Sequence, residues 1–278
     1  MARIIFRLLM TLLKRVKSPR FFDLLERISE QCARLQGIGM GGGIDVSGEH
    51  IVMRTINHAL ANDVVLFDVG ANRGQYTESL LSVFKDKNYT IHCFEPAHDT
   101  FLLLESHKYI VGNAHIILNN FALGKNHGEV ELYSDQSGSG LASLTQRRLD
   151  HFGIHFNKIE TVQVKTLDEY CRNNAVTSID LLKIDVEGHE LDVLEGARTL
   201  FSNMAVQFVQ FEFGGCNIDT RTFVQNFFYF FKPFDFEIYR ITPSGYCRHL
   251  PVYKETYEQF ITTNFLAVHR SVPFAQQF

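Results

Sequence analysis

Short apolar runs alternate with segments of helical spacing along most of the chain. A run of four to seven apolar residues predicts a buried strand, and apolar residues every three or four positions predict a helix. From residue 64 to residue 120, predicted strands and helices alternate strictly. The strands are predicted at 64–68, 90–95 and 115–120, and the helices from about 75 and at 99–108. Such alternation is typical of a parallel sheet covered by helices.

The rhythm is interrupted in the middle of the chain and then resumes. The interruption predicts a hairpin strand at 129–133, a Gly/Ser-rich loop at 134–143, a strand near 161–165 and a short helix at 167–171. The resumed pattern predicts strands at 179–185, 206–213, 236–241 and 265–269, with helices at 190–200 and near 223–231. Seven core strands therefore predict a doubly wound, Rossmann-like α/β sheet, whose ligands bind at the carboxyl ends of the strands.

The first 45 residues are predicted to form an N-terminal helical extension, followed by one domain over 46–278. A glycine cluster at 37–43 must end any helix, and we expect it to act as a hinge. Apolar residues share one face of residues 3–17 and basic residues the other, although the segment is too short to span a bilayer. Packing on its own domain or on a second subunit is the simpler interpretation, and contact with an anionic membrane is the alternative.

Composition argues against several classes of function. With 278 residues, 45% of them hydrophobic, the chain can bury one large core. The net charge of −4 gives no general attraction to nucleic acid, so a polynucleotide partner is not expected. The five cysteines are scattered without zinc-ligand spacing. We therefore expect reduced thiols in a cytoplasmic protein and assign no residue as a metal ligand.

The sharpest motif is an apolar strand that ends in Asp68 and turns through Gly70, Asn72 and Gly74 into a helix. Glycines at this turn let the backbone approach a ligand at the start of the helix. The carboxylate of Asp68 would repel the pyrophosphate of a dinucleotide. It would attract the ammonium and sulfonium charges of S-adenosylmethionine. A tight turn without a ligand remains the purely structural interpretation.

Two further polar residues end the next two strands. Glu95 closes the second strand, where an acid in nucleotide-binding α/β folds accepts hydrogen bonds from ribose hydroxyls. Asn120 ends the third strand and could offer amide hydrogen bonds to an adenine edge. Ordinary turn residues at the ends of strands are the alternative for both.

A third motif delivers Asp185, Glu187 and His189 to the same edge of the sheet as Asp68. Two acids and a histidine there could orient a substrate hydroxyl, take its proton or hold a divalent cation. The alternative is a helix start, where acidic side chains are favoured by the helix dipole. We predict catalytic roles for these three residues.

Four ordered motifs together resemble the FkbM family of S-adenosylmethionine-dependent methyltransferases. The matching segments are 68–74, 94–96, 120–124 and 183–197, within a resemblance that covers roughly residues 60 to 215. It implies the class I methyltransferase form of the seven-stranded sheet. It also implies that Asp68 and the 70–74 turn hold the methionine moiety, Glu95 the ribose and Asn120 the adenine side.

The resemblance further implies O-methylation of a small-molecule or sugar hydroxyl. The rival from another class is a binding or scaffold protein that keeps the cofactor fold without turnover. A dinucleotide-dependent oxidoreductase is a second rival, which Asp68 disfavours. We expect the acceptor pocket to be built from the 134–143 loop and the 213–217 turn, with Tyr239 or Tyr246 as further candidates.

Overall fold

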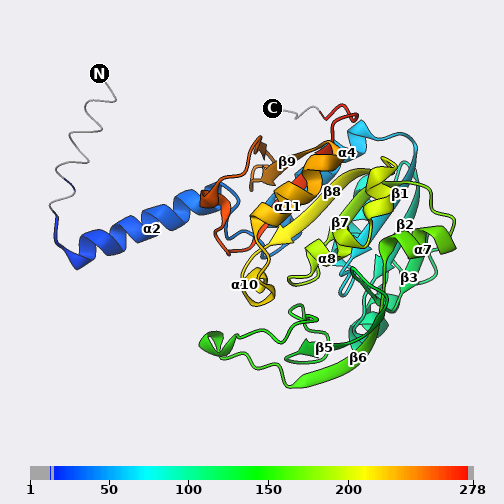
Figure 1. Ribbon diagram of the computed structural model, residues 1–278, viewed down its shortest axis with the longest axis horizontal. Helices are drawn as coiled ribbons and strands as arrows, with labels where there is room; N and C mark the ends of the chain where they lie inside the picture. The colour runs from blue at the N-terminus through cyan, green and yellow to red at the C-terminus, as the bar shows by residue number, and fades with distance from the viewer. Residues whose placement is uncertain (1–12, 14–15, 275–278) are drawn as a thin grey trace.

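The computed structural model, which describes residue 13 and residues 16–274, is built around one large sheet (Figure 1). Its order is β10-β9-β11-β8-β7-β1-β2-β3. Strands β3, β2, β1, β7 and β8 run parallel, whereas β11 is antiparallel to both β8 and β9. The bounds are β1 Asp63–Val69, β2 Asn88–Phe94, β3 Ile116–Asn119, β7 Ile179–Ile184, β8 Val206–Phe213, β9 Phe236–Ile241, β10 Cys247–His249 and β11 Thr263–His269.

All seven predicted core strands lie in this sheet, which confirms the doubly wound α/β class and the class I methyltransferase form. The predicted number of strands is one short. The eighth strand, β10, is a strand of three residues at the edge of the sheet, paired with β9. A segment of that length is too short to show an alternating pattern, so the sequence did not reveal it.

The middle of the chain, where the alternation of strands and helices is interrupted, forms a separate three-stranded sheet in the order β4-β6-β5. These strands are Ala122–Leu123, Lys158–Lys165 and Gly128–Ser134, respectively. In Figure 1 this small sheet lies beyond the carboxyl ends of the main-sheet strands β1, β2 and β7. Its loop therefore faces the edge where ligands of open α/β sheets bind.

Helices cover both faces of the main sheet, with a hydrophobic core on each side. One core joins the sheet to α7, α8, α9 and α11. The other joins it to α4, α5 and α6. The bounds are α2 Pro19–Leu35, α3 Ile44–Ser47, α4 Glu49–Ala59, α5 Gln75–Phe84, α6 His98–Glu105, α7 Leu167–Asn173, α8 Glu190–Glu195, α9 Arg198–Ser202, α10 Cys216–Thr220 and α11 Val224–Phe231, with single 3₁₀ turns at Asp150–Phe152, Lys232–Phe234 and Glu255–Tyr257.

Two helical predictions need correction. The sequence reading left the residues of α4 unassigned, although Val52, Met53 and Ile56 of this helix are fully buried against the sheet. The helix predicted at 190–200 is broken into α8 and α9 around Gly196. A Cβ at Gly196 would lie 2.1 Å from the carbonyl oxygen of Gly124, so this close approach of distant segments requires glycine.

The first part of the glycine segment packs against the main sheet, and its predicted role as a hinge stays a prediction. Ile38 is buried and forms a β-bridge with Thr263, and the Gly39 amide donates to the Thr262 carbonyl. A Cβ on Gly37 would lie 1.9 Å from the carbonyl oxygen of Ile241, so glycine is required for this close packing. The amphipathic helix predicted over 3–17 lies almost entirely outside the described residues. The division of the chain at residue 45 stays a prediction.

Within the described part of the chain, no helix combines the length and the apolar composition needed to cross a membrane. The thiols of Cys93, Cys171 and Cys216 are free and buried, whereas that of Cys32 is exposed on α2.

Candidate functional site

A cleft of about 460 Å³ opens at the carboxyl edge of the main sheet. It lies where β1 adjoins β7, which is the point at which the order of the strands reverses. The ends of β1, β2, β7 and β8 form its floor, and residues 139–144 of the insertion line it from the small sheet's side. Gly41, Gly43 and Ile44, which follow the docked glycine segment, complete the wall.

Asp68 lies at the floor of this cleft and is 1% exposed. One carboxylate oxygen, Oδ2, accepts a hydrogen bond of 2.6 Å from the hydroxyl of Thr77 on α5. Burial raises the pKa of Asp68 from 3.8 to about 6, although the Thr77 hydrogen bond opposes the shift. A buried acid with a raised pKa is a group that a cationic ligand would stabilise in its charged form.

The two glycines of the turn after β1 have different surroundings. Gly70 lines the cleft with a φ of +82°, and a Cβ there would lie 1.8 Å from the carbonyl oxygen of Asp185. Gly74, with a φ of +90°, instead faces Leu104 and Ile110 near α6 and does not line the cleft. Gly70 therefore permits the close approach of the β1 and β7 turns, and Gly74 permits packing of the α5 start.

Asn72 and Glu95 are joined by a hydrogen bond across the cleft wall. The backbone amide of Asn72, whose φ is +49°, donates to Glu95 Oε2 over 3.0 Å. Glu95 Oε1 accepts from the Ala97 amide, and burial raises the pKa of Glu95 from 4.5 to about 7. The side-chain oxygen of Asn72 is buried without a hydrogen-bond partner in the described structure. It is an acceptor available to a donor group in the cleft.

Asn120 occupies a different place from the other predicted cofactor residues. Its amide nitrogen donates to the carbonyl oxygens of Glu95 and Pro96, at 2.9 and 3.0 Å, and the residue does not line the cleft. Phe121, Ala122 and Leu123, which follow it, do line the cleft. Asn120 thus holds the turn after β2, and its role beside an adenine stays a prediction.

The end of β7 brings a lysine and several acids together. The Lys183 ammonium is buried and lies 3.2 Å from Asp185 Oδ2. Burial opposes this charge, but the acids around it, Asp185 and Glu49 foremost, together outweigh burial and raise the pKa of Lys183. Carboxylate oxygens of Asp185, Glu187 and Glu212 lie within 4.8 Å of one another, close enough to share a cation. Burial and these neighbouring acids raise the pKa of Glu212 well above its ordinary value.

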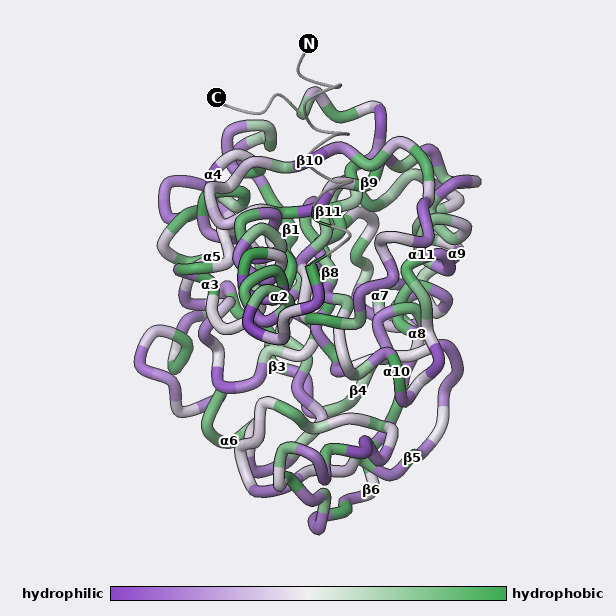
Figure 2. The backbone as a smooth tube through the Cα atoms, turned by 90° about the vertical axis from the view of Figure 1, so that its left-hand side faces the viewer, coloured by the Kyte–Doolittle hydropathy of each residue, from purple (hydrophilic) through white to green (hydrophobic). Residues whose placement is uncertain are grey.

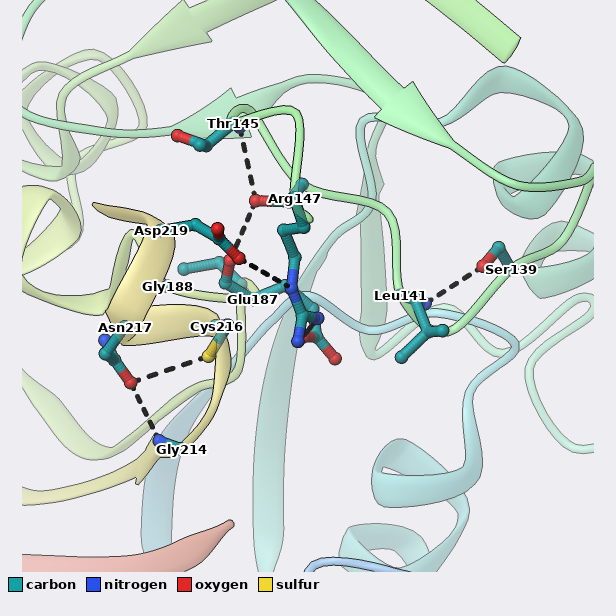
Figure 3. Close-up of polar contacts among 12 residues, drawn as sticks. Ser139, Leu141, Thr145, Arg147, Glu187, Gly188, Gly214, Cys216, Asn217 and Asp219 are labelled. Atoms are coloured by element: carbon teal, nitrogen blue, oxygen red, sulfur yellow. Dashed lines mark hydrogen bonds and ion pairs between the residues drawn. The ribbon is translucent and has the colours of Figure 1, made fainter. Parts of the chain in front are cut away.

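Glu187 is held by the insertion. Its carboxylate forms an ion pair with Arg147, which also lies 3.9 Å from Asp219 of α10 (Figure 3). The hydroxyl of Ser143 donates to the Glu187 carbonyl, where the backbone has a left-handed φ of +53°. Burial and the charge of Asp185 raise the pKa of Glu187 to about 8, although Arg147 lowers it. This carboxyl therefore titrates near neutral pH, as a general base does.

His189 lines the same side of the cleft, and both of its ring nitrogens have partners. Nδ1 lies 2.8 Å from a carboxylate oxygen of Asp192, and Nε2 lies 2.9 Å from the Thr145 hydroxyl. The three predicted catalytic residues are thus brought together at one wall, and His189 is the most constrained of them.

Glu190, the acid that directly follows His189, has a structural role. It is fully buried, and its Oε1 accepts hydrogen bonds from the backbone amides of Val186 and Gly188. Its other oxygen faces the Asn217 amide at 3.4 Å, and Asn217 in turn accepts from the Gly214 amide. Glu190 therefore fixes the turns after β7 and β8 to each other.

The sequence reading missed several residues at the cleft. Lys183, Glu212 and Glu49 line it, and Arg147 supports its wall through Glu187. A lysine inside an otherwise apolar strand was the visible signal for Lys183. No local signal marks the other three, because they come from separate segments. Of the expected acceptor-pocket residues, 139–143 line the cleft, whereas residues 134–138, the 213–217 turn, Tyr239 and Tyr246 do not.

Comparisons with known proteins agree on one kind of enzyme. The family model described as the methyltransferase FkbM domain matches residues 68–237. The hexuronic acid methyltransferase AglP of Haloferax volcanii is 28% identical over 173 residues, which are 61% of this chain. The match spans 65% of AglP, less than two thirds of that protein.

Solved methyltransferase structures are also similar. The FkbM methyltransferase from Methylobacillus flagellatus KT superposes with a TM-score of 0.45 at 17% identity, over 91% of this chain and 72% of that one. An O-methyltransferase from Bacillus cereus in complex with SAH gives a TM-score of 0.41 at 8% identity, over 91% and 92% of the two chains.

Proposed function

The chain belongs to the FkbM methyltransferase family, and on that premise we propose that it transfers a methyl group from S-adenosylmethionine to a hydroxyl of a sugar or another small molecule. The observation that carries the proposal is the cleft at the strand reversal, with the buried carboxyl of Asp68 at its floor. A buried acid favours a cationic ligand over the pyrophosphate of a dinucleotide. The rival oxidoreductase is therefore disfavoured by the same residue.

The cleft residues fit the proposed methyl donor. Asp68 and Glu95 supply negative charge, and the unpartnered oxygen of Asn72 supplies an acceptor for an ammonium or hydroxyl donor. Each oxygen of the Glu95 carboxylate accepts one backbone hydrogen bond and keeps capacity for ribose hydroxyls. When bound, S-adenosylmethionine supplies a methyl group on a positively charged sulfur.

The acids after β7 would serve the acceptor. A neutral alcohol is a poor nucleophile, so its proton must be taken as the bond to the methyl carbon forms. Glu187, with its raised pKa and its place beside the insertion loop, is the best-placed base. Asp185 and His189 would orient the hydroxyl, and the ion pair with Lys183 would hold the Asp185 carboxylate in place. Holding the acceptor oxygen in line with the methyl group would supply much of the rate enhancement.

The class of the acceptor rests on a relative, and its place in the cleft rests on the insertion. The printed name of AglP is a hexuronic acid methyltransferase, which supports a sugar acceptor for this chain. Residues 139–144 of the insertion line the cleft, and the Ser143 hydroxyl donates to the Glu187 carbonyl. The acceptor would therefore bind between the insertion and the acids after β7.

Two measurements test the proposal. Calorimetry with S-adenosylmethionine and, separately, with NAD should give binding of the first alone. Incubation with methyl-labelled donor and a panel of uronic acid glycans should then transfer label to an alkali-stable ether on one acceptor. Binding without transfer to any glycan or small hydroxyl compound would favour the scaffold alternative, and binding of NAD alone would refute the donor.

A further inference from the structure

The helix α2 projects from the body of the protein (Figure 1), and none of its residues is buried. Successive helical residues are about 100° apart, which places its apolar side chains within an arc of about 100°. These side chains are Phe21, Leu24, Leu25, Ile28, Cys32 and Leu35. The exposed fractions of Leu24, Ile28 and Leu35 are 53%, 50% and 76%. A continuous apolar stripe of this kind is costly to leave in water.

The direction of α2 is fixed at its carboxyl end. The Arg240 guanidinium donates to Gln36 Oε1 over 3.1 Å, and Ile38 is buried beside β11. The chain then passes through Gly41 and Gly43, which line the cleft. In Figure 2 the same helix points toward the viewer, away from both sheets. The stripe therefore belongs to an anchored arm rather than to a loose tail.

The charge of the adjoining sequence indicates what the stripe binds. Residues 1–20 contain six basic residues and no acidic one, whereas all 31 acidic residues of the chain lie beyond them. An apolar stripe joined to a strongly basic segment is the pattern of helices that lie on anionic membrane surfaces.

We propose that α2 and the basic segment before it dock on an anionic membrane surface. The apolar stripe would enter the boundary between headgroups and acyl chains, and the basic residues would pair with lipid phosphates. The acidic body would be repelled by the same surface, so docking would be confined to this end of the molecule. Because α2 is anchored beside the cleft, docking would also fix the position of the cleft relative to the membrane.

Vesicle sedimentation tests this with full-length protein. Phosphatidylcholine vesicles containing phosphatidylglycerol should bind the protein at low salt, and phosphatidylcholine alone should bind it far less. Replacing Leu25 and Ile28 together by Glu should lower binding about a hundredfold, since each large aliphatic side chain contributes about tenfold or more. Replacing Ser29 and Gln31 by Glu adds the same charge outside the stripe and should lower binding much less.

Circular dichroism and light scattering make the result decisive. Both double variants should keep the wild-type helical signal, so a change in binding reports the stripe. Equal loss of binding in the two variants would overturn docking through the stripe, as would the absence of binding to anionic vesicles. A wild-type dimer that the Leu25 and Ile28 variant dissociates, without vesicle binding, would assign the stripe to a second copy of the chain instead.

Discussion

At the scale of single residues, the cleft gathers carboxyl groups whose charged forms are costly to bury. Asp68, Glu95 and Glu187 all have pKa values raised mainly by burial, to about 6, about 7 and about 8. A carboxyl with a raised pKa holds its proton more tightly in the folded than in the unfolded chain. Its contribution to stability is present below about pH 4 and is lost as pH rises through the raised pKa. The ligand-free protein should therefore lose stability between about pH 4 and pH 8.

Asp68→Asn should separate binding from stability. The amide cannot attract a cationic donor, so calorimetry should show affinity for S-adenosylmethionine reduced about tenfold to a hundredfold. The same change removes a buried charge and keeps an acceptor for Thr77, so the melting temperature at pH 8 should rise by several degrees. Asp63→Asn, at the exposed start of β1, is the control and should change neither. Unchanged affinity in Asp68→Asn would contradict the cofactor role.

Glu187→Gln should remove the pH dependence of turnover. A base must be deprotonated, so wild-type turnover should fall as pH drops below about 8. The amide variant should have a kcat lower by about 10²–10⁴-fold, and its turnover should no longer fall as the pH drops below about 8. Its affinity for the donor should equal that of the wild type. Glu105→Gln, exposed at the end of α6, should match the wild type. If Glu187→Gln and Asp185→Asn both keep wild-type turnover, these acids serve the turn and another group is the base.

At the scale of elements, the site depends on two strand ends that approach more closely than most side chains permit. Gly70 meets the Asp185 carbonyl, and Glu190 ties the turn after β7 to the turn after β8. These contacts set the spacing between the ends of β1 and β2, where we propose that the donor binds, and the ends of β7 and β8, where we propose that the acceptor binds. The turns therefore work as one unit rather than as independent loops.

Gly70→Ala tests this spacing. The new Cβ would lie 1.8 Å from a backbone oxygen at a φ of +82°, so one strand end must move. We expect a loss of unfolding free energy of about 3 kcal/mol or more and the loss of donor binding. Gly128→Ala is the matched control, because a Cβ there meets nothing within 4 Å. In urea unfolding, the free energy of unfolding of Gly128→Ala should be close to that of the wild type. If the two variants lose the same stability, the contact between Gly70 and the Asp185 carbonyl is not as close as the structure shows.

At the scale of the whole molecule, the N-terminal residues divide into an exposed arm and a docked segment. Removing residues 1–35 deletes α2, which has no buried residue, so folding and donor affinity should persist. Removing residues 1–43 also deletes buried Ile38 and two cleft-lining glycines. That chain should lose about 2–5 kcal/mol of stability and bind the donor more weakly. Thermal melts and calorimetry on the two truncated chains distinguish these outcomes, and identical behaviour would contradict the docked segment.

The sequence by itself determined the features that adjacent residues encode. Strands β8 and β9 match their predicted bounds, and the motifs placed Asp68, Glu95 and Asp185 at the strand ends that meet in the cleft. These predictions succeed because apolar periodicity and turn residues act over a few positions. Sequence patterns also indicated the family that the comparisons identify.

Only the tertiary structure decided which distant groups share the cleft. Glu49 comes from a helix that the sequence did not predict, Glu212 from the end of β8 and Arg147 from the insertion. Their partners are set by strand order and by the fold of the small sheet, which no local pattern encodes. The raised pKa of Glu187 follows from the same apposition, since burial and a neighbouring charge exist only once the chain has folded.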